Sequence, residues 1–161
     1  MTIIFENKKK GRLTEFNINL IHIDSEHLSI TDCDDGSKID MGSSDFSKIC
    51  RELHSLSESV SIETKSDYIK FSVDGDSGKG SVKLEPNEGD SRDNSVAINC
   101  SEEVNLSFAL RYLNMFNKAN TLSDKVHIHL SNEAPLTVQY NIQDYGSLKF
   151  YLAPKITEDE S

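Results

Sequence analysis

The chain has 161 residues, of which 36% are hydrophobic and 27% are charged, and its formal net charge is −10. This suits one globular domain with a short extension, and no apolar run approaches the ~18 residues that a membrane-spanning helix needs. A uniformly acidic protein would be repelled by nucleic acid, so the net charge alone favours a protein or a small molecule as partner.

The first residues and the cysteines lead us to expect an intracellular protein. The stretch MTIIFENKKKG places its charges after a short apolar segment, which is the reverse of a secretory signal. Cys33, Cys50 and Cys100 lie far apart and form no C-x-x-C pair. We expect free thiols in a reducing compartment, with Cys50 and Cys100 in the core.

The N-terminal part predicts a β-hairpin followed by a linker. The stretches TIIFE and RLTEFNINLIHI are rich in β-branched and aromatic residues and flank a polar loop, NKKKG. Residues 24–42 are polar and acidic and carry an isolated apolar pair, Leu28 and Ile30. We expect this stretch to be an extended linker outside the core.

The remainder of the chain predicts an α+β domain with many antiparallel strands and two short helices. A first helix is expected in residues 43–59, with an apolar stripe formed by Phe46, Ile49, Cys50 and Leu53. A second helix is expected in residues 106–120, with a buried face formed by Ala109, Tyr112, Leu113 and Phe116. Strands are expected in SVSIET, YIKFSV, GSVKL, SVAINC, KVHIHL, LTVQYNI and SLKFYLA, before an acidic tail, TEDES.

The stretch DGDSGKG, residues 74–80, raises two alternatives that both fail. A calcium loop needs a glycine at its sixth position, where this stretch has Lys79, and a phosphate loop needs Ser or Thr after Gly-Lys, where it has Gly80. Strand-like segments flank the stretch on both sides. It therefore predicts a turn between two strands, and Gly80 suggests a close backbone approach there.

The cations of the two predicted helices contrast with the acidic chain. Lys48 and Arg51 lie opposite the apolar stripe of the first helix, and Arg111 and Lys118 share a face of the second with Asn114. No acid occurs between Leu106 and Leu122. Ordinary solvated helix faces would give the same pattern, so the cations alone do not decide a function.

No signature of catalysis is visible in the sequence. His127 and His129 alternate along a predicted strand and so share one face, where two imidazoles could begin a zinc site, but no third ligand is obvious and surface histidines are the simpler alternative. There is no G-x-S-x-G, H-E-x-x-H or paired-carboxylate pattern. We expect no enzyme, no metal and no cofactor.

Three stretches resemble one family. LSFALRYLNMFNKANTLSDKV and LKFYLAPKITEDES resemble the C-terminal part of proliferating cell nuclear antigen, the eukaryotic sliding-clamp family, and SSDFSKICREL resembles the helix that opens its second domain. The order and spacing of these stretches also match the family. The resemblance implies a DNA-clamp fold, with residues 1–23 as the last strands of a first domain, 24–40 as the interdomain connector and 41–161 as the second domain.

The resemblance also implies a function and an assembly. Family subunits close head to tail into a trimeric ring in the nucleus, whose helices line a hole that holds duplex DNA without reading its sequence. The ring tethers the replicative DNA polymerase, the clamp loader and other client proteins. A shortened chain suggests an alternative, a peptide-binding adaptor or competitor of the full clamp that closes no ring.

The resemblance assigns roles to residues of this chain. The expected DNA contacts are Lys48, Arg51, Arg111 and Lys118. The expected subunit interface pairs the strand of Arg12 and Phe16 with the strand of Gly80 and Val82. The expected client-peptide groove comprises Leu28, Ile30, Pro135, Tyr151, Ala153 and Pro154. Lys65 occupies the position of the family's ubiquitin and SUMO acceptor.

Overall fold

The computed structural model describes residues 1–20, 35–87 and 95–156, and the chain divides into two compact units, Met1–Asp32 and Cys33–Ser161. The first unit contains an antiparallel hairpin of β1 (Thr2–Asn7) and β2 (Arg12–Asn17). A 3-10 turn, η1 (Lys8–Lys10), joins the strands, and Gly11 closes it with a φ of 57°. The predicted hairpin around NKKKG is confirmed.

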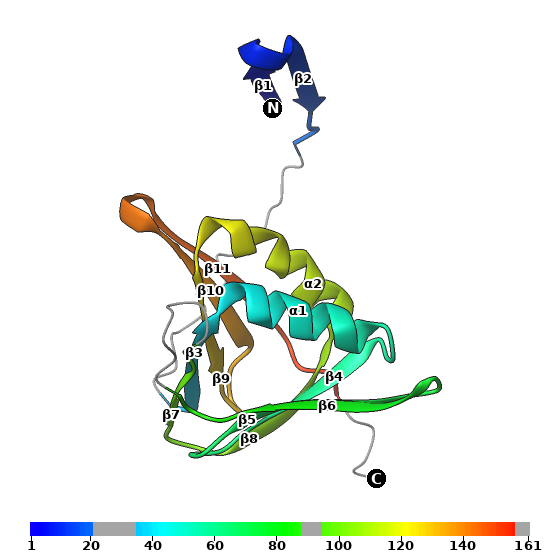
Figure 1. The fold of residues 1–161 in the computed structure, drawn as a ribbon, viewed down its shortest axis with the longest axis vertical. Helices are drawn as coiled ribbons and strands as arrows, with labels where there is room; N and C mark the ends of the chain where they lie inside the picture. The colour runs from blue at the N-terminus through cyan, green and yellow to red at the C-terminus, as the bar shows by residue number, and fades with distance from the viewer. Residues whose placement is uncertain (21–34, 88–94, 157–161) are drawn as a thin grey trace. The chain divides into compact units, whose positions relative to one another are not determined.

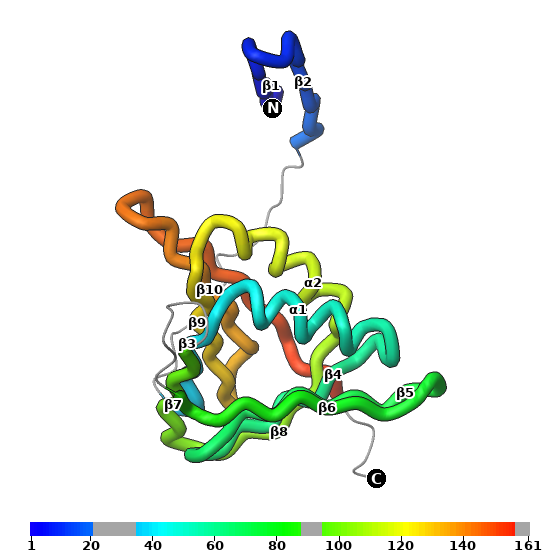
Figure 2. The backbone as a smooth tube through the Cα atoms, viewed as in Figure 1, coloured from blue at the N-terminus to red at the C-terminus, as the bar shows by residue number. Residues whose placement is uncertain are grey.

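Two antiparallel sheets make up most of the second unit (Figure 1). A five-stranded sheet has the order β11-β10-β9-β3-β7, and a four-stranded sheet has the order β6-β5-β4-β8. Their strands are β3 (Ser37–Gly42), β4 (Ser59–Thr64), β5 (Ile69–Gly75), β6 (Gly78–Leu84), β7 (Ala97–Cys100), β8 (Val104–Ala109), β9 (Lys125–Leu130), β10 (Leu136–Ile142) and β11 (Gly146–Leu152). Figure 2 shows β5 and β6 as one long hairpin, whose turn is the predicted one in DGDSGKG.

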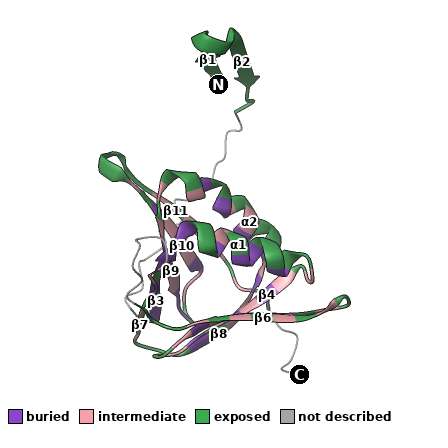
Figure 3. Ribbon diagram, in the orientation of Figure 1, coloured by how far each residue is buried: buried purple, intermediate pink, exposed green. Residues whose placement is uncertain are grey.

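Two helices lie side by side against the sheets (Figure 1). They are α1 (Ser43–His54) and α2 (Leu110–Phe116), and α2 continues as a 3-10 helix, η2 (Asn117–Leu122). The Asn114 amide of α2 donates a hydrogen bond of 3.5 Å to the Cys50 carbonyl of α1. Buried residues lie on the sheet side of both helices and exposed residues on the opposite side (Figure 3).

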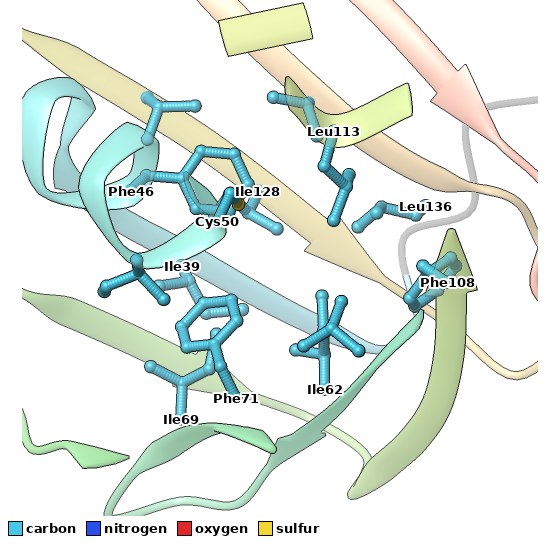
Figure 4. Packing of buried hydrophobic residues seen from close by; sticks show 14 of the residues in the cluster. Ile39, Phe46, Cys50, Ile62, Ile69, Phe71, Phe108, Leu113, Ile128 and Leu136 are labelled. Atoms are coloured by element: carbon cyan, nitrogen blue, oxygen red, sulfur yellow. The ribbon is translucent and has the colours of Figure 1, made fainter. Parts of the chain in front are cut away.

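The core fills the space between the helices and the two sheets (Figure 4). Phe46 of α1 packs near Phe71 of β5, with ring centroids 6.1 Å apart. Ile39, Ile62 and Leu113 are each 0% exposed and come from different elements. Each such side chain contributes about 1.5–3 kcal/mol of burial free energy, so the core ties all three layers together.

The structure confirms an α+β fold of antiparallel sheets with two short helices. It corrects the expectation that residues 24–42 form a linker outside the core. Ser37–Gly42 is β3, a strand between β9 and β7, and Ile39 and Met41 are 0% exposed. Only two apolar residues, Ile39 and Met41, alternate with polar neighbours here, which is too short a pattern to predict strand β3. Residues 24–34 and the acidic tail, 157–161, lie outside the described residues.

The second helix is shorter than its sequence pattern suggests. Residues 106–109 belong to β8 and pair with β4, so α2 begins at Leu110. Its buried residues are Leu110 and Leu113, whereas Tyr112 is 38% exposed. A short apolar run fits a strand and a helix equally well, so the sequence alone does not assign residues 106–109. Their pairing with β4 makes them part of a strand. Within the described ranges, no helix is long and apolar enough to cross a bilayer.

Candidate functional site

The outer side of α1 and α2 carries four cations, all exposed. Lys48 and Arg51 project from α1 opposite its buried residues, Arg111 lies in the first turn of α2, and Lys118 lies in η2 rather than in the helix itself. Among the residues that the structure describes, no carboxylate forms an ion pair with any of the four. Their charges are therefore available to an anionic partner.

Local contacts shape this surface. The Arg111 guanidinium donates a hydrogen bond of 2.8 Å to the Tyr112 hydroxyl and lies 4.6 Å from the centroid of the same ring. Asn114, expected on the same polar face, is half-buried and contacts α1 instead. Met115 was not expected to belong to this surface, but it is 58% exposed between Arg111 and Lys118. The helical spacing of four residues from Arg111 to Met115 could have revealed it.

Four of the six expected groove residues lie in the described part of the chain, and Leu28 and Ile30 fall outside it. Thr137 pairs with Tyr151, and Leu136 pairs with Leu152. Because Pro135 directly precedes Leu136 and Ala153 directly follows Leu152, both lie at the open end of the β10–β11 hairpin. The residue after Pro154 is Lys155, and its backbone N–H donates a hydrogen bond of 2.7 Å to the Ser107 carbonyl of β8. The segment after β11 is thereby tied to the four-stranded sheet.

The expected interface residues lie on two strands with open edges. In the described residues, β6 pairs only with β5, and β2 pairs only with β1. Phe16 is 53% exposed and meets Phe5 edge to face, with centroids 6.1 Å apart. Strand edges of this kind can accept a strand from another chain.

The close approach at Gly80 is made within the chain. A Cβ on Gly80 would lie 2.9 Å from Leu56 Cδ1, whose residue follows α1. The expected approach of a second backbone is therefore not found within the described chain, where the close neighbour of Gly80 is a leucine side chain. The role of Gly80 between subunits is not tested by this contact.

Lys65 lies just after β4 in a turn, where its backbone N–H donates a hydrogen bond of 2.9 Å to the Tyr68 carbonyl. Its Nζ is 3.7 Å from Glu103 and 3.8 Å from Glu63. Glu103, followed by Tyr68 and Glu63, raises the pKa of the Lys65 ammonium. The amine is therefore held in its charged form at neutral pH.

His127 and His129 make separate contacts on the predicted common face. His127 Nδ1 is 2.5 Å from Asp40 Oδ1 and its Nε2 is 2.9 Å from Asn141 Nδ2. His129 Nε2 is 3.1 Å from the carbonyl of Asp35. In the described ranges, no three His, Cys, Asp or Glu side chains come together as a metal site would require.

Two comparisons with known proteins bear on this arrangement. A family model described as proliferating cell nuclear antigen, C-terminal domain, matches residues 29–155. The chain is also 44% identical, over 161 residues, to a protein of Chaetomium thermophilum named proliferating cell nuclear antigen. That alignment covers 99% of this chain and 62% of the fungal protein, so the chain spans less than two thirds of the length of this relative.

Proposed function

The chain belongs to the proliferating cell nuclear antigen family, and on that premise we propose that it serves as part of a DNA sliding clamp, a processivity factor of DNA replication and repair. It would hold duplex DNA without reading sequence and tether the replicative DNA polymerase, the clamp loader and other clients in the nucleus. In this proposal residues 1–23 end a first domain, the connector starts at Asp24 and ends before β3 (Ser37–Gly42), and the second domain begins with β3. The clamp family is non-enzymatic, and we propose that this chain is likewise no enzyme and needs no cofactor.

One observation carries the proposal: four exposed cations of α1, α2 and η2, for which the described part of the chain supplies no ion-pair partner, in a chain with a net charge of −10. Lys48, Arg51, Arg111 and Lys118 would contact the phosphate backbone. Such contacts position a duplex without specifying its sequence, and the acidic remainder would repel DNA from other faces. This distribution explains how an acidic protein can hold nucleic acid.

The assembly proposed for this function is a head-to-tail homotrimer. Its seam would join β2, with Arg12 and Phe16, to β6 of another copy, with Gly80 and Val82. A heterologous contact of this kind closes into a ring when its rotation permits. The open edges of both strands support this pairing.

Client peptides would bind where Pro135, Tyr151, Ala153 and Pro154 gather, with Leu28 and Ile30 of the connector as the opposite wall. The tie between Lys155 and Ser107 supports this site, because it holds the floor in place when no peptide is present. We also propose Lys65 as an acceptor of ubiquitin or SUMO. Its side chain is 39% exposed, which would leave the amine within reach of a conjugating enzyme.

The proposal is tested by reversing the charge of Arg111 and Lys118. Arg111→Glu with Lys118→Glu should weaken retention on duplex DNA after loading, while binding of a client peptide is kept. Lys38→Glu with Lys70→Glu makes a comparable change of charge on strands β3 and β5 of the two sheets and should leave retention intact. Equal retention by both double variants would contradict the assignment of the helices to DNA.

The adaptor alternative shares the peptide groove but needs no ring. It predicts a monomer that binds client peptides and shows no DNA retention even when a clamp loader is supplied. Native mass spectrometry separates the two, because a closed ring gives a discrete oligomer of the 18.0 kDa chain.

A further inference from the structure

The outward side of α2 and η2 carries an exposed apolar side chain in line with two cations. Met115 is 58% exposed, and Arg111 and Lys118 are exposed as well. Met115 follows Arg111 by four residues and precedes Lys118 by three, a spacing that puts the three side chains on one face. Leu113, which is 0% exposed, lies two residues before Met115 and points roughly the opposite way. Met115 therefore points away from the core.

The surroundings of Met115 favour an anionic partner. No acid occurs between Leu106 and Leu122, and the described part of the chain offers neither Arg111 nor Lys118 a carboxylate partner. Tyr112 is also exposed on α2, but its hydroxyl is already engaged by Arg111. Among the described residues of α1, no large apolar side chain is exposed. The apolar surface that Met115 presents is thus bordered by cations.

A strand of DNA has a matching alternation of charge and apolar surface. Its phosphates are separated by deoxyribose rings, whose C–H groups are apolar. A helix face with an apolar side chain between two cations can therefore contact sugar and phosphate together. Contacts of this kind carry no information about the base sequence.

We propose that Met115 packs against deoxyribose between phosphates held by Arg111 and Lys118, and that this contact favours DNA over RNA. A ribose 2′-hydroxyl at this place would be buried against an apolar side chain without a hydrogen-bond partner, which costs free energy. The 2′-hydroxyl is the group by which a protein distinguishes RNA from DNA. The inference rests on the proposed assignment of the helices to DNA and adds to it a contact that reads the sugar.

The contribution of Met115 differs from that of the cations in its salt dependence. Phosphate contacts release counterions and weaken as the salt concentration rises, whereas burial of an uncharged side chain releases none. Met115→Gln should therefore lower retention on duplex DNA by about three- to tenfold at every salt concentration, with an unchanged salt slope. Met115→Leu keeps an apolar side chain of similar volume and should retain most of the affinity. Circular dichroism on both variants verifies that the fold is kept.

Oxidation by hydrogen peroxide tests the contact directly, and the other two methionines of the chain supply the controls. Met1 is 61% exposed and Met41 is 0% exposed. In the free chain, Met1 and Met115 should be oxidised and Met41 should be protected, because sulfoxide formation follows access to the sulfur. On loading of the full chain onto duplex DNA, the oxidation rate of Met115 should fall severalfold while that of Met1 stays the same. Mass spectrometry of peptides measures the three rates.

An RNA–DNA hybrid of the same sequence tests the preference for deoxyribose. The unaltered chain should be retained on the hybrid about fivefold less well than on the DNA duplex, because a hydroxyl is buried unpaired. The different helical shape of the hybrid can also change binding, so Met115→Gln is the matched control. This variant should be retained equally on the two duplexes.

The outcomes separate this inference from the proposal beneath it. If Met115 is oxidised equally fast with and without DNA while Arg111→Glu with Lys118→Glu still weakens retention, the helices bind DNA and this inference is wrong. Protection of Met115 in the chain without DNA would show that another surface covers it, which also overturns the inference. A preference for DNA over the hybrid that survives in Met115→Gln would refute the reading of the sugar. If neither the charge reversal nor Met115 responds to DNA, the proposed function and the inference fail together.

Discussion

Three polar side chains occupy the core between α1 and the five-stranded sheet. Tyr140 is 0% exposed and its hydroxyl donates a hydrogen bond of 2.8 Å to Asn117 Oδ1. Cys50 lies nearby on α1 and is 1% exposed. Burial raises the pKa of the Cys50 thiol to about 12, and the neighbouring Asn117 amide offsets only part of this. The group is therefore a neutral core residue and no reactive thiol, as the sequence predicted.

The raised pKa of Cys50 makes stability depend on alkaline pH. The unfolded thiol ionises near its ordinary value of 9.0 while the folded thiol keeps its proton to about 12, so the folded state binds more protons in this window. Its contribution to stability is complete below pH 9 and declines as the pH rises toward 12, by about 1 kcal/mol at pH 10. Urea titrations at pH 7 and pH 10 should show this loss in the unaltered chain relative to Cys50→Ala. An equal loss in both would contradict it.

Gly36 is the residue whose substitution should damage the fold most directly. Its φ is 118°, and an added Cβ would lie 2.2 Å from the Leu130 carbonyl oxygen. Gly36→Ala should therefore destabilise the protein by about 2–4 kcal/mol, since backbone strain and a clash with a neighbouring strand add. Gly11→Ala is the matched control: φ is 57° and no atom lies within 4 Å, so only the strain of about 1 kcal/mol remains. Equal melting temperatures of the two variants would refute the clash.

At the scale of elements, the β5–β6 hairpin is fitted to the end of α1. A Cβ on Gly80 would meet Leu56 Cδ1 at 2.9 Å, and Leu53 Cδ2 and Val73 Cγ2 at 3.6 Å. Because Leu56 is a flexible side chain, Gly80→Ala should cost only about 1–2 kcal/mol. In the Leu56→Ala background the cost should fall by about 0.5–1 kcal/mol, as expected for residues in contact. Strictly additive free energies of unfolding, from urea titration of the four chains, would show that the contact does not matter.

The sequence predicted elements best where a pattern extended over a full strand or helix. The strands from SVSIET to SLKFYLA and the stripe of α1 were predicted correctly, because alternation and helical spacing are local properties. The limits of α2 and the existence of β3 and β8 were not, because Ser37–Gly42 and Val104–Ala109 take their conformation from neighbouring strands far away in the sequence. For the candidate site, exposure of the four cations was predictable from spacing. The contact of Asn114 with α1 depends on tertiary packing.

At the scale of the whole molecule, net charge and local charge have opposite consequences. A chain with a net charge of −10 repels DNA at long range, while the four exposed cations of α1, α2 and η2 would attract it at short range. Proteins that hold DNA through its phosphates alone release bound counterions and depend steeply on salt. If the proposed function is right, the affinity of the assembled molecule for DNA depends steeply on salt concentration, whichever clients it binds.

We expect retention on duplex DNA to vary with salt and not with base sequence. Each copy that makes four phosphate contacts contributes about −3.6 to the slope of log affinity against log salt concentration. Reversing Arg111 and Lys118 removes two of the four cations and should at least halve that slope. The measurement is fluorescence anisotropy of loaded complexes on two duplexes of unrelated sequence, across a salt series, with Lys38→Glu and Lys70→Glu as the matched control. A slope that the helix variant leaves unchanged, or one that differs between the two duplexes, would place the DNA contacts elsewhere on the molecule.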